Sequence, residues 1–350
     1  MPITLDEIAA LVAAAARAPS VHNSQPWRFR VCGNALELHA DHDRNLRHTD
    51  PDGREMLISC GAALYGLRLG IRKLGYLPAV QILPDPAQPT LIARVRPGGR
   101  APITRHEQDM HAALPHRHSH RGPFAPVPVP GRLLAGLCAD ATAEGAALIL
   151  IDQPDRLADL AGLIAAADQA QQASPEIRAE LRRWTRPAGS DARDGVPAHA
   201  WAGTQSADVR RPPAPPPAAA EPRDDGLPAT SASQRTAPAP ARLPQRDFGL
   251  PGSLPGGGPP PSATAVLTTP GDAPADWLRA GQALHRMLLH AATRWVFASL
   301  HTQPLESPAA RGELRTRLAL DGMPQMLMQL GRANTAPATA RRPANEMIDH

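Results

Sequence analysis

The sequence predicts an α+β protein made of two related halves, residues 1–103 and 104–350. Side-chain periodicity indicates helices with an apolar face and also strands that alternate apolar and polar residues. Each half contains one long segment, residues 55–76 or 274–299, that is expected to form a largely buried helix. Within the two segments, CGAALYGLRLGIRKLG and AGQALHRMLLHAATRW both begin with small residues. Similar elements surround the two segments. We interpret the halves as divergent copies of one unit.

Composition and charge exclude several classes of protein. The chain has 350 residues, of which 42% are hydrophobic and 3% aromatic, enough for an aliphatic core in two domains. The net charge of +4 comes without a long Lys/Arg run, so we expect no nucleic-acid partner. No signal peptide and no apolar run of about 18 residues is recognisable, so we expect no membrane partner. The 3 cysteines match no zinc pattern, and we expect a reduced, cytoplasmic protein.

The first half has clear boundary signals. Thr4 and Glu7 have the spacing of a capping box, which predicts the start of a helix. That helix is expected to end at Ala18, because Pro19 disfavours helical geometry in the residue before it. The other expected elements are a hairpin over residues 27–41, the buried helix over 55–76, and strands over 79–85 and 90–97.

The second half has weaker boundaries and a long insert. Helices are expected over residues 104–114, 130–140, 155–171, 174–185 and 274–299, and strands over 146–152, 263–270 and 324–332. Between about residues 187 and 261 the pattern fails, because stretches such as RRPPAPPPAAAEP cannot form the interior of a helix or strand. A connection this long is usually functional or disordered, which makes it a candidate lid.

The stretch APSVHNSQPWRF, residues 18–29, concentrates amides in a chain that has few of them. Asn23 and Gln25 each carry a donor and an acceptor, which suits the edge of a heterocycle such as a flavin. Alternatively, they tie this turn to neighbouring chain segments while Trp27 fills the core. The spacing alone favours the second interpretation, because loops of that kind are common.

A second polar stretch is RHSHR. Arg117, Ser119 and Arg121 alternate, so on an extended chain they share one face. Two guanidinium groups and a hydroxyl form a good phosphate site. A solvated surface is the alternative that the pattern leaves open.

Other candidates are weaker. His116, His118 and His120 also alternate, but no carboxylate or cysteine lies close in sequence, so we expect no metal site. Cys60, at the start of a buried helix, is interpreted as a structural thiol. The Gly-rich stretch GSLPGGG neither follows a strand nor opens a helix, so it is not a dinucleotide loop.

Two of these motifs carry a family resemblance. PSVHNSQPW resembles the flavin-contacting loop of FMN-dependent nitroreductases, and RHSHR with Phe124 resembles their Arg-x-Ser-x-Lys/Arg motif. The chain most resembles the Acg family of tandem nitroreductase-like proteins, through HTDPDGREMLISCGAAL, RHSHRGPF, PGDAPADWLRAGQAL and RRPANEMI. The likeness covers nearly the whole chain except the insert. It implies an α+β nitroreductase-like fold whose two halves form an intrachain pseudo-dimer, so a monomer suffices.

The resemblance also implies one composite FMN site. The first half has the amide loop but no Arg-x-Ser motif, and the second half has the reverse. Arg117 and Ser119 are then expected at the phosphate and ribityl chain, and Arg121 near the N1/O2 edge of the ring. The full set of expected cofactor-binding residues is Pro19, Ser20, Asn23, Arg117, His118, Ser119, Arg121, Thr302, Gln303, Arg341 and Arg342.

The resemblance implies a reductase in which FMN takes hydride from NAD(P)H and passes electrons to nitro compounds or quinones. Such a reaction needs no acid, base or nucleophile from the protein, so no catalytic residue is expected. One alternative is a protein that holds FMN under a lid without turnover, in settings linked to dormancy or stress. Another is a degenerate relative that binds no flavin, which the intact pair of half-motifs disfavours.

Overall fold

The first helix begins at the capping box that the sequence predicts. The computed structural model describes residues 4–122, 124–187, 189–197, 243–244, 246, 263–333 and 339–349. In it, α1 spans Leu5–Ala16. The Thr4 hydroxyl accepts a hydrogen bond from the Glu7 N–H at 3.2 Å, and the Glu7 carboxylate accepts one from the Thr4 N–H at 2.9 Å. The helix ends slightly before the expected Ala18.

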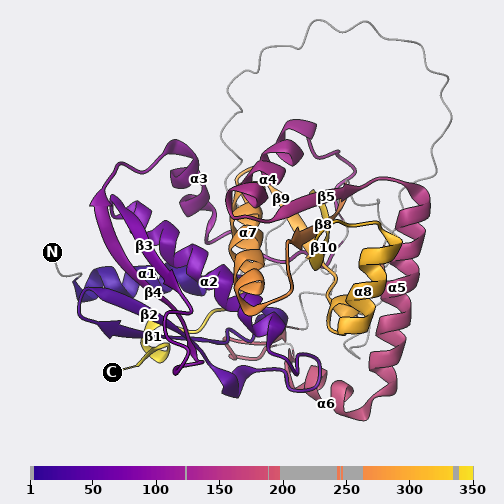
Figure 1. Cartoon of the computed structure of the whole chain (residues 1–350), viewed down its shortest axis with the longest axis horizontal. Helices are drawn as coiled ribbons and strands as arrows, with labels where there is room; N and C mark the ends of the chain where they lie inside the picture. The colour runs from indigo at the N-terminus through magenta and orange to yellow at the C-terminus, as the bar shows by residue number, and fades with distance from the viewer. Residues whose placement is uncertain are drawn as a thin grey trace, which may run out of the picture.

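The first half folds around a sheet of order β11-β1-β2-β4-β3, which includes the last strand of the chain. β1 and β2 form the expected hairpin, whose turn holds Gly33 at φ +60°. β11 pairs in parallel with β1, so the C-terminal segment returns to the first half, as Figure 1 shows. The elements are β1 (Trp27–Cys32), β2 (Ala35–Ala40), α2 (Arg54–Lys73), β3 (Tyr76–Ile82), β4 (Leu91–Arg100) and β11 (Ile348–Asp349).

The second half has its own antiparallel sheet, of order β5-β8-β10-β9. Helices α5 and α8 pack together beside this sheet, at the far side from the first half (Figure 1). The elements are α3 (Arg105–Ala113), α4 (Gly131–Ala143), β5 (Ala147–Ile151), α5 (Pro154–Ala173), α6 (Pro175–Arg183), β6 (Thr185–Arg186), β7 (Val196–Pro197), β8 (Ala263–Thr269), α7 (Pro274–Ala292), β9 (Val296–Leu300), α8 (Pro308–Arg317) and β10 (Met323–Arg332).

The expected helix over residues 274–299 is wrong in its last turns. α7 ends at Ala292, the chain turns with Trp295 at φ +57°, and residues 296–300 form strand β9. There Ala298 lies opposite Leu330 of β10. A short apolar run does not distinguish a buried helix from a buried strand, and here sheet hydrogen bonds and the strand preference of Val296 and Phe297 decide.

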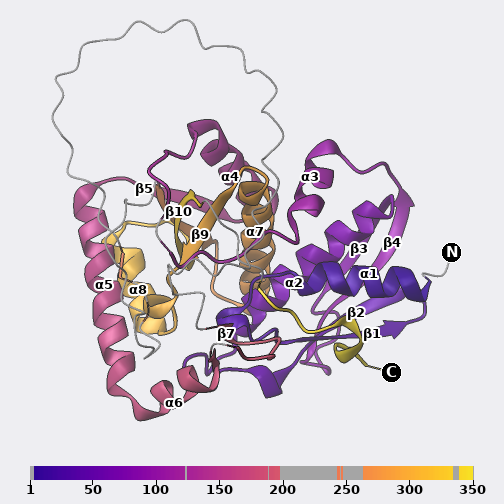
Figure 2. The same ribbon diagram turned by 180° about the vertical axis from the view of Figure 1, so that it is seen from behind.

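The two long helices, α2 and α7, meet at a pair of glycines. A Cβ atom at Gly61 would lie 2.3 Å from the Leu278 carbonyl oxygen, and one at Gly281 would lie 2.0 Å from the Ile58 carbonyl oxygen. Only glycine permits backbones this close. Both views show the two helices side by side at the junction of the halves (Figures 1 and 2). This contact therefore sets how the halves meet.

Most of the insert expected over residues 187–261 lies outside the described residues, so the candidate lid stays a prediction. Its described parts are anchored at both ends. Residues 193–195 contact the turn after α1, and Leu243 is buried in the core between α5, α8 and the second sheet. Across the part of the chain that the structure describes, no helix is both long and apolar enough to cross a membrane.

Candidate functional site

A pocket lies where the two halves meet. It encloses about 750 Å³ of space between protein atoms, a volume that includes open solvent. The turn after α1 and the start of α2 line it from the first half. From the second half, residues 119–121, α7, β9 and the segment after β9 line it. Six of the expected site residues line this pocket: Pro19, Ser20, Ser119, Arg121, Thr302 and Gln303.

The RHSHR stretch reaches the pocket because it is extended beside β9. Ser119 forms an isolated parallel bridge with Ala298, and the His120 N–H donates to the Ala298 carbonyl at 2.8 Å. Ser119 and Arg121 both line the pocket, but His120 between them lines it too and Arg117 does not, so the lining does not follow the predicted alternation. Burial lowers the pKa of Arg121 to about 10, so its guanidinium is still charged at neutral pH.

Arg117 and His118 lie behind this lining. Arg117 is buried and donates through Nε to the Arg17 carbonyl at 3.2 Å, while its Nη1 has no hydrogen-bond partner among the described residues. The His118 ring packs against Phe297, with ring centroids 4.2 Å apart. Burial lowers the pKa of His118 to about 3, so this ring is neutral.

Asn23 lies in a strained turn and contacts protein on both sides. It has φ +56°, which asparagine tolerates better than most residues. Its Nδ2 donates to the Gly195 carbonyl at 3.2 Å and to the Ala340 carbonyl at 3.3 Å. Its Oδ1 accepts from Arg341 at 2.9 Å. The Asn23 amide thus joins the turn, the start of the insert and the C-terminal segment.

Gln25 also joins the turn after α1 to the insert and to the C-terminal segment. Its Nε2 donates to the Arg193 carbonyl at 2.7 Å, and its Oε1 accepts from the Arg342 N–H at 2.9 Å. Trp27 is fully buried in the first core. The structure therefore shows Asn23 and Gln25 tying the turn to neighbouring chain segments and Trp27 filling the core, which is the interpretation that the spacing favours.

The two C-terminal arginines do not line the pocket. Arg341 donates to the carbonyls of Ala16 and Ala18, at 2.9 Å and 3.2 Å, at the end of α1. Burial, followed by the nearby charge of Arg117, lowers its pKa. Arg342 is buried and donates through Nη2 to the Glu346 carbonyl at 2.7 Å. Both side chains hold the C-terminal segment against the turn after α1.

Two residues that line the pocket from the second half carry buried hydrogen-bond donors without partners among the described residues. Gln303 is 3% exposed, and its Nε2 has no hydrogen-bond partner within the described ranges. Arg246, from the insert, forms an ion pair with Glu306 and donates to the Thr302 hydroxyl at 3.3 Å. Its buried Nη1 has no hydrogen-bond partner among the described residues. Buried unpaired donors are costly, so an acceptor on a bound ligand would stabilise both groups.

Glu55 is the acidic group of the pocket, and sequence reasoning did not select it. It is 3% exposed, at the start of α2, and it forms a close ion pair with Arg54. Burial raises the pKa of Glu55 to about 7. Glu55 belongs to the HTDPDGREMLISCGAAL stretch, which gave the only signal for it. Arg246 lies in the irregular insert, where no local signal exists.

The pocket fits a flavin mononucleotide in the character of its donors. Flavin rings present carbonyl oxygens along one edge, and the phosphate adds further acceptors. The pocket offers two guanidinium groups, from Arg121 and Arg246, with the Gln303 amide and the Ser119 hydroxyl. Apolar contacts come from side chains such as Ile58 and Leu284. Cationic donors around an apolar slot are what an anionic aromatic ligand requires.

Comparison with known proteins places the chain in a family. It is 32% identical over 342 residues, spanning 96% of this chain and 89% of the relative, to a Mycobacterium tuberculosis protein named "Putative NAD(P)H nitroreductase Rv3131". The chain belongs to the nitroreductase family. A nitroreductase family model also matches residues 1–49.

The Acg-like character of this nitroreductase is confirmed by a second relative. The M. tuberculosis protein named "Putative NAD(P)H nitroreductase acg" is 27% identical over 99% of this chain and 96% of its own length. A solved nitroreductase with bound FMN from Desulfitobacterium hafniense gives a TM-score of 0.37 at 12% identity, covering 69% of this chain and 97% of that chain. We draw no conclusion about this chain from a structural similarity this low. Family membership confirms the expected nitroreductase-like α+β fold, whereas the individual site residues stay predictions.

Proposed function

We propose that this chain is an FMN-dependent oxidoreductase that uses NAD(P)H to reduce nitro compounds or quinones. The observation that carries the proposal is the pocket between the halves, with buried unpaired donors at Gln303 and Arg246 and the Ser119–Arg121 stretch at its wall. The names of the relatives support the same activity. The alternative of FMN storage without turnover lacks comparable support.

The expected site residues divide into two roles in this proposal. Those lining the pocket contact the flavin: Ser119 and Arg121 at the phosphate and N1/O2 edge, and Pro19, Ser20, Thr302 and Gln303 at the ring. Arg117 contributes its unpaired Nη1 from behind Ser119. Asn23, His118, Arg341 and Arg342 position these groups by fixing the turn after α1 and the stretch beside β9.

FMN, when bound, would accept hydride from the nicotinamide and deliver electrons to the acceptor. The chain supplies positive charge from Arg121, which stabilises an anionic reduced flavin. Glu55 holds a proton on its carboxyl group below about pH 7 and loses it above.

Because both half-sites lie in one chain, we propose that a monomer is functional. We also propose a cytoplasmic location, in which the three cysteines stay reduced.

The first test is the visible spectrum of the purified protein, before and after heat release of any ligand. Flavin bands are expected, with FMN in the supernatant, and NADPH is expected to bleach the bound flavin under anaerobic conditions. Bleaching that does not reverse on adding a nitro compound or quinone would favour storage over turnover. A colourless protein that takes up no added FMN would contradict the site.

A matched pair of variants locates the flavin. Arg121→Gln removes a pocket charge, and we expect FMN affinity to fall at least about tenfold, as for loss of a charged hydrogen bond. Arg105→Gln serves as the control, because Arg105 is exposed on α3. Equal affinity in both variants would remove Arg121 from the site.

A further inference from the structure

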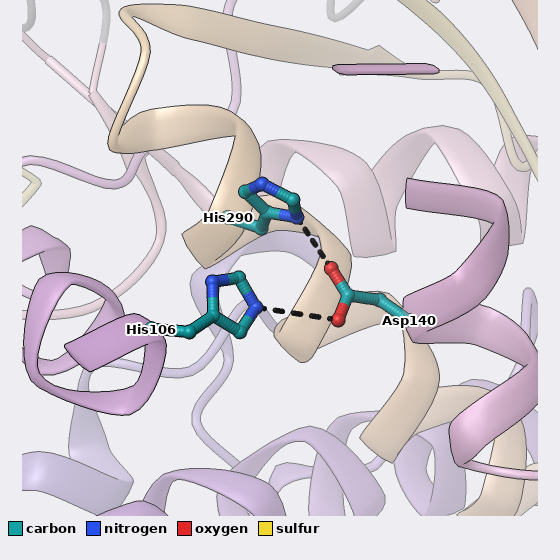
Figure 3. A group of neighbouring side chains, drawn as sticks. All are labelled: His106, Asp140 and His290. Atoms are coloured by element: carbon teal, nitrogen blue, oxygen red, sulfur yellow. Dashed lines mark hydrogen bonds and ion pairs between the residues drawn. The ribbon is translucent and has the colours of Figure 1, made fainter. Parts of the chain in front are cut away.

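Three side chains that are distant in sequence converge outside the flavin pocket. His106 Nε2 lies 3.5 Å from Asp140 Oδ1, and His290 Nδ1 lies 2.6 Å from Asp140 Oδ2. These three ligand atoms all lie within 4.8 Å of one another. Figure 3 shows the two imidazole rings on the same side of the carboxylate, each directed at one of its oxygens. None of the three residues lines the pocket.

Each of the three residues comes from a different helix. His106 is in the first turn of α3, Asp140 is in α4, and His290 is near the end of α7. Gly136, one helical turn before Asp140, makes room for the His290 ring. A Cβ atom at Gly136 would lie 2.8 Å from His290 Cε1. The local backbone thus accommodates an imidazole beside the carboxylate.

A second layer of contacts fixes the carboxylate. Arg286 donates through Nε to Asp140 Oδ1 at 2.8 Å and through Nη1 to Glu144 Oε1 at 3.1 Å. Glu144 in turn accepts from Arg68 at 2.6 Å. Metal-binding carboxylates are commonly oriented by such outer hydrogen bonds. The Asp140 side chain is 5% exposed, so water reaches little of it.

We propose that His106, Asp140 and His290 bind a zinc ion, with the fourth position open to water or an external ligand. Two imidazoles and one carboxylate are ligands that zinc accepts, whereas magnesium and calcium prefer oxygen alone. In a tetrahedral zinc site, donor atoms lie about 3.3 Å apart, given zinc–ligand bonds of about 2.0–2.2 Å. The observed separations bracket this value. His106, at 42% exposure, has the freedom to make the adjustment.

The bound ion would cross-link α3 to α4 and α7. α3 is the first helix after the junction of the halves, and α7 is the long helix that packs against α2. A ligand that binds the folded protein better than the unfolded chain stabilises the fold. Zinc is therefore expected to raise the melting temperature whether or not flavin is bound.

The test titrates zinc into chelator-washed, full-length protein in competition with a chromophoric chelator. Wild type is compared with His106→Gln, His290→Gln and His111→Gln. His111 is the matched control, because it is also on α3 but belongs to no such cluster among the described residues. His106→Gln is the main variant, since its exposed ring contributes little to folding.

We expect wild type and His111→Gln to bind one zinc ion at least about tenfold more tightly than His106→Gln and His290→Gln do. Weaker sites among the other histidines are common to all four proteins. We also expect zinc to raise the melting temperature of wild type but not that of His106→Gln. Equal affinity in wild type and His106→Gln, or no tight site in wild type, would overturn the proposal. Neither result depends on flavin binding.

Discussion

Replacing Gly281 with alanine tests how the two halves are held together. The new Cβ would lie 2.0 Å from the Ile58 carbonyl oxygen and 2.7 Å from the Ala62 nitrogen, both on the α2 backbone. Real Cβ contacts are rarely closer than 3.0 Å, so α2 and α7 must separate by roughly 1 Å at their crossing. Backbone atoms cannot move aside as a flexible side chain can.

The magnitude follows from two opposing effects. Overpacking a core of this kind costs about 1–3 kcal/mol, and a backbone contact belongs at the upper end. Alanine is a better helix former than glycine by about 1 kcal/mol, which offsets part of that cost. We expect Gly281→Ala to lower the free energy of unfolding by about 2 kcal/mol. FMN affinity should fall as well, because Ile58 and Leu284 line the pocket on these two helices.

The matched control is Gly162→Ala. Gly162 is exposed in the middle of α5, and a Cβ atom there would have no atom within 4 Å. This variant gains helix propensity without a clash, so we expect it to be up to about 1 kcal/mol more stable than wild type. Urea unfolding, followed by circular dichroism, measures both variants. If Gly281→Ala were as stable as Gly162→Ala, the glycine contact would not determine the crossing.

Two further predictions concern the turn after α1 and the pocket acid. Gln25→Ala removes hydrogen bonds to residues 193 and 342, so we expect urea unfolding to show a free energy of unfolding lower by about 1–3 kcal/mol, with FMN stoichiometry unchanged. Loss of FMN without loss of stability would instead place Gln25 at the flavin. Glu55 gains its negative charge as the pH rises through about 7, beside an anionic ligand, so the ratio of FMN affinity in Glu55→Gln to that in wild type should rise several-fold between pH 6 and pH 8. Fluorescence titrations measure this ratio, and a ratio independent of pH would show that Glu55 does not face the flavin.

Local sequence signals predicted most elements of the fold. The capping box at Thr4, the hairpin turn at Gly33 and the apolar run of α2 all depend on neighbouring residues, so they could be read without tertiary information. The end of α7 and the strand β9 could not, because sheet pairing with β10 decided between two conformations that an apolar run allows. The sequence did not predict α8 either, because only Arg311 and Leu314 of its ten residues are buried and its apolar pattern is weak.

The candidate site divides in the same way. Alternation along an extended chain grouped Ser119 with Arg121, which both line the pocket, but His120 between them lines it as well. It did not show that Arg117 lies behind the pocket lining, or that Glu55 and Arg246 reach the pocket. Their positions depend on how helices and the insert pack, which no local pattern records.

By itself, the sequence determined many local conformations, because capping, turn and periodicity signals act over a few residues, while the division into two related halves stays a prediction. Only the tertiary structure decided which residues that are distant in sequence come into contact. It turned the amides of Asn23 and Gln25 toward the insert and the C-terminal segment. It also brought Asp140 to His290, which is 150 residues away in sequence. Such contacts join segments that are distant in sequence, so they depend on tertiary packing, which outweighs local preference.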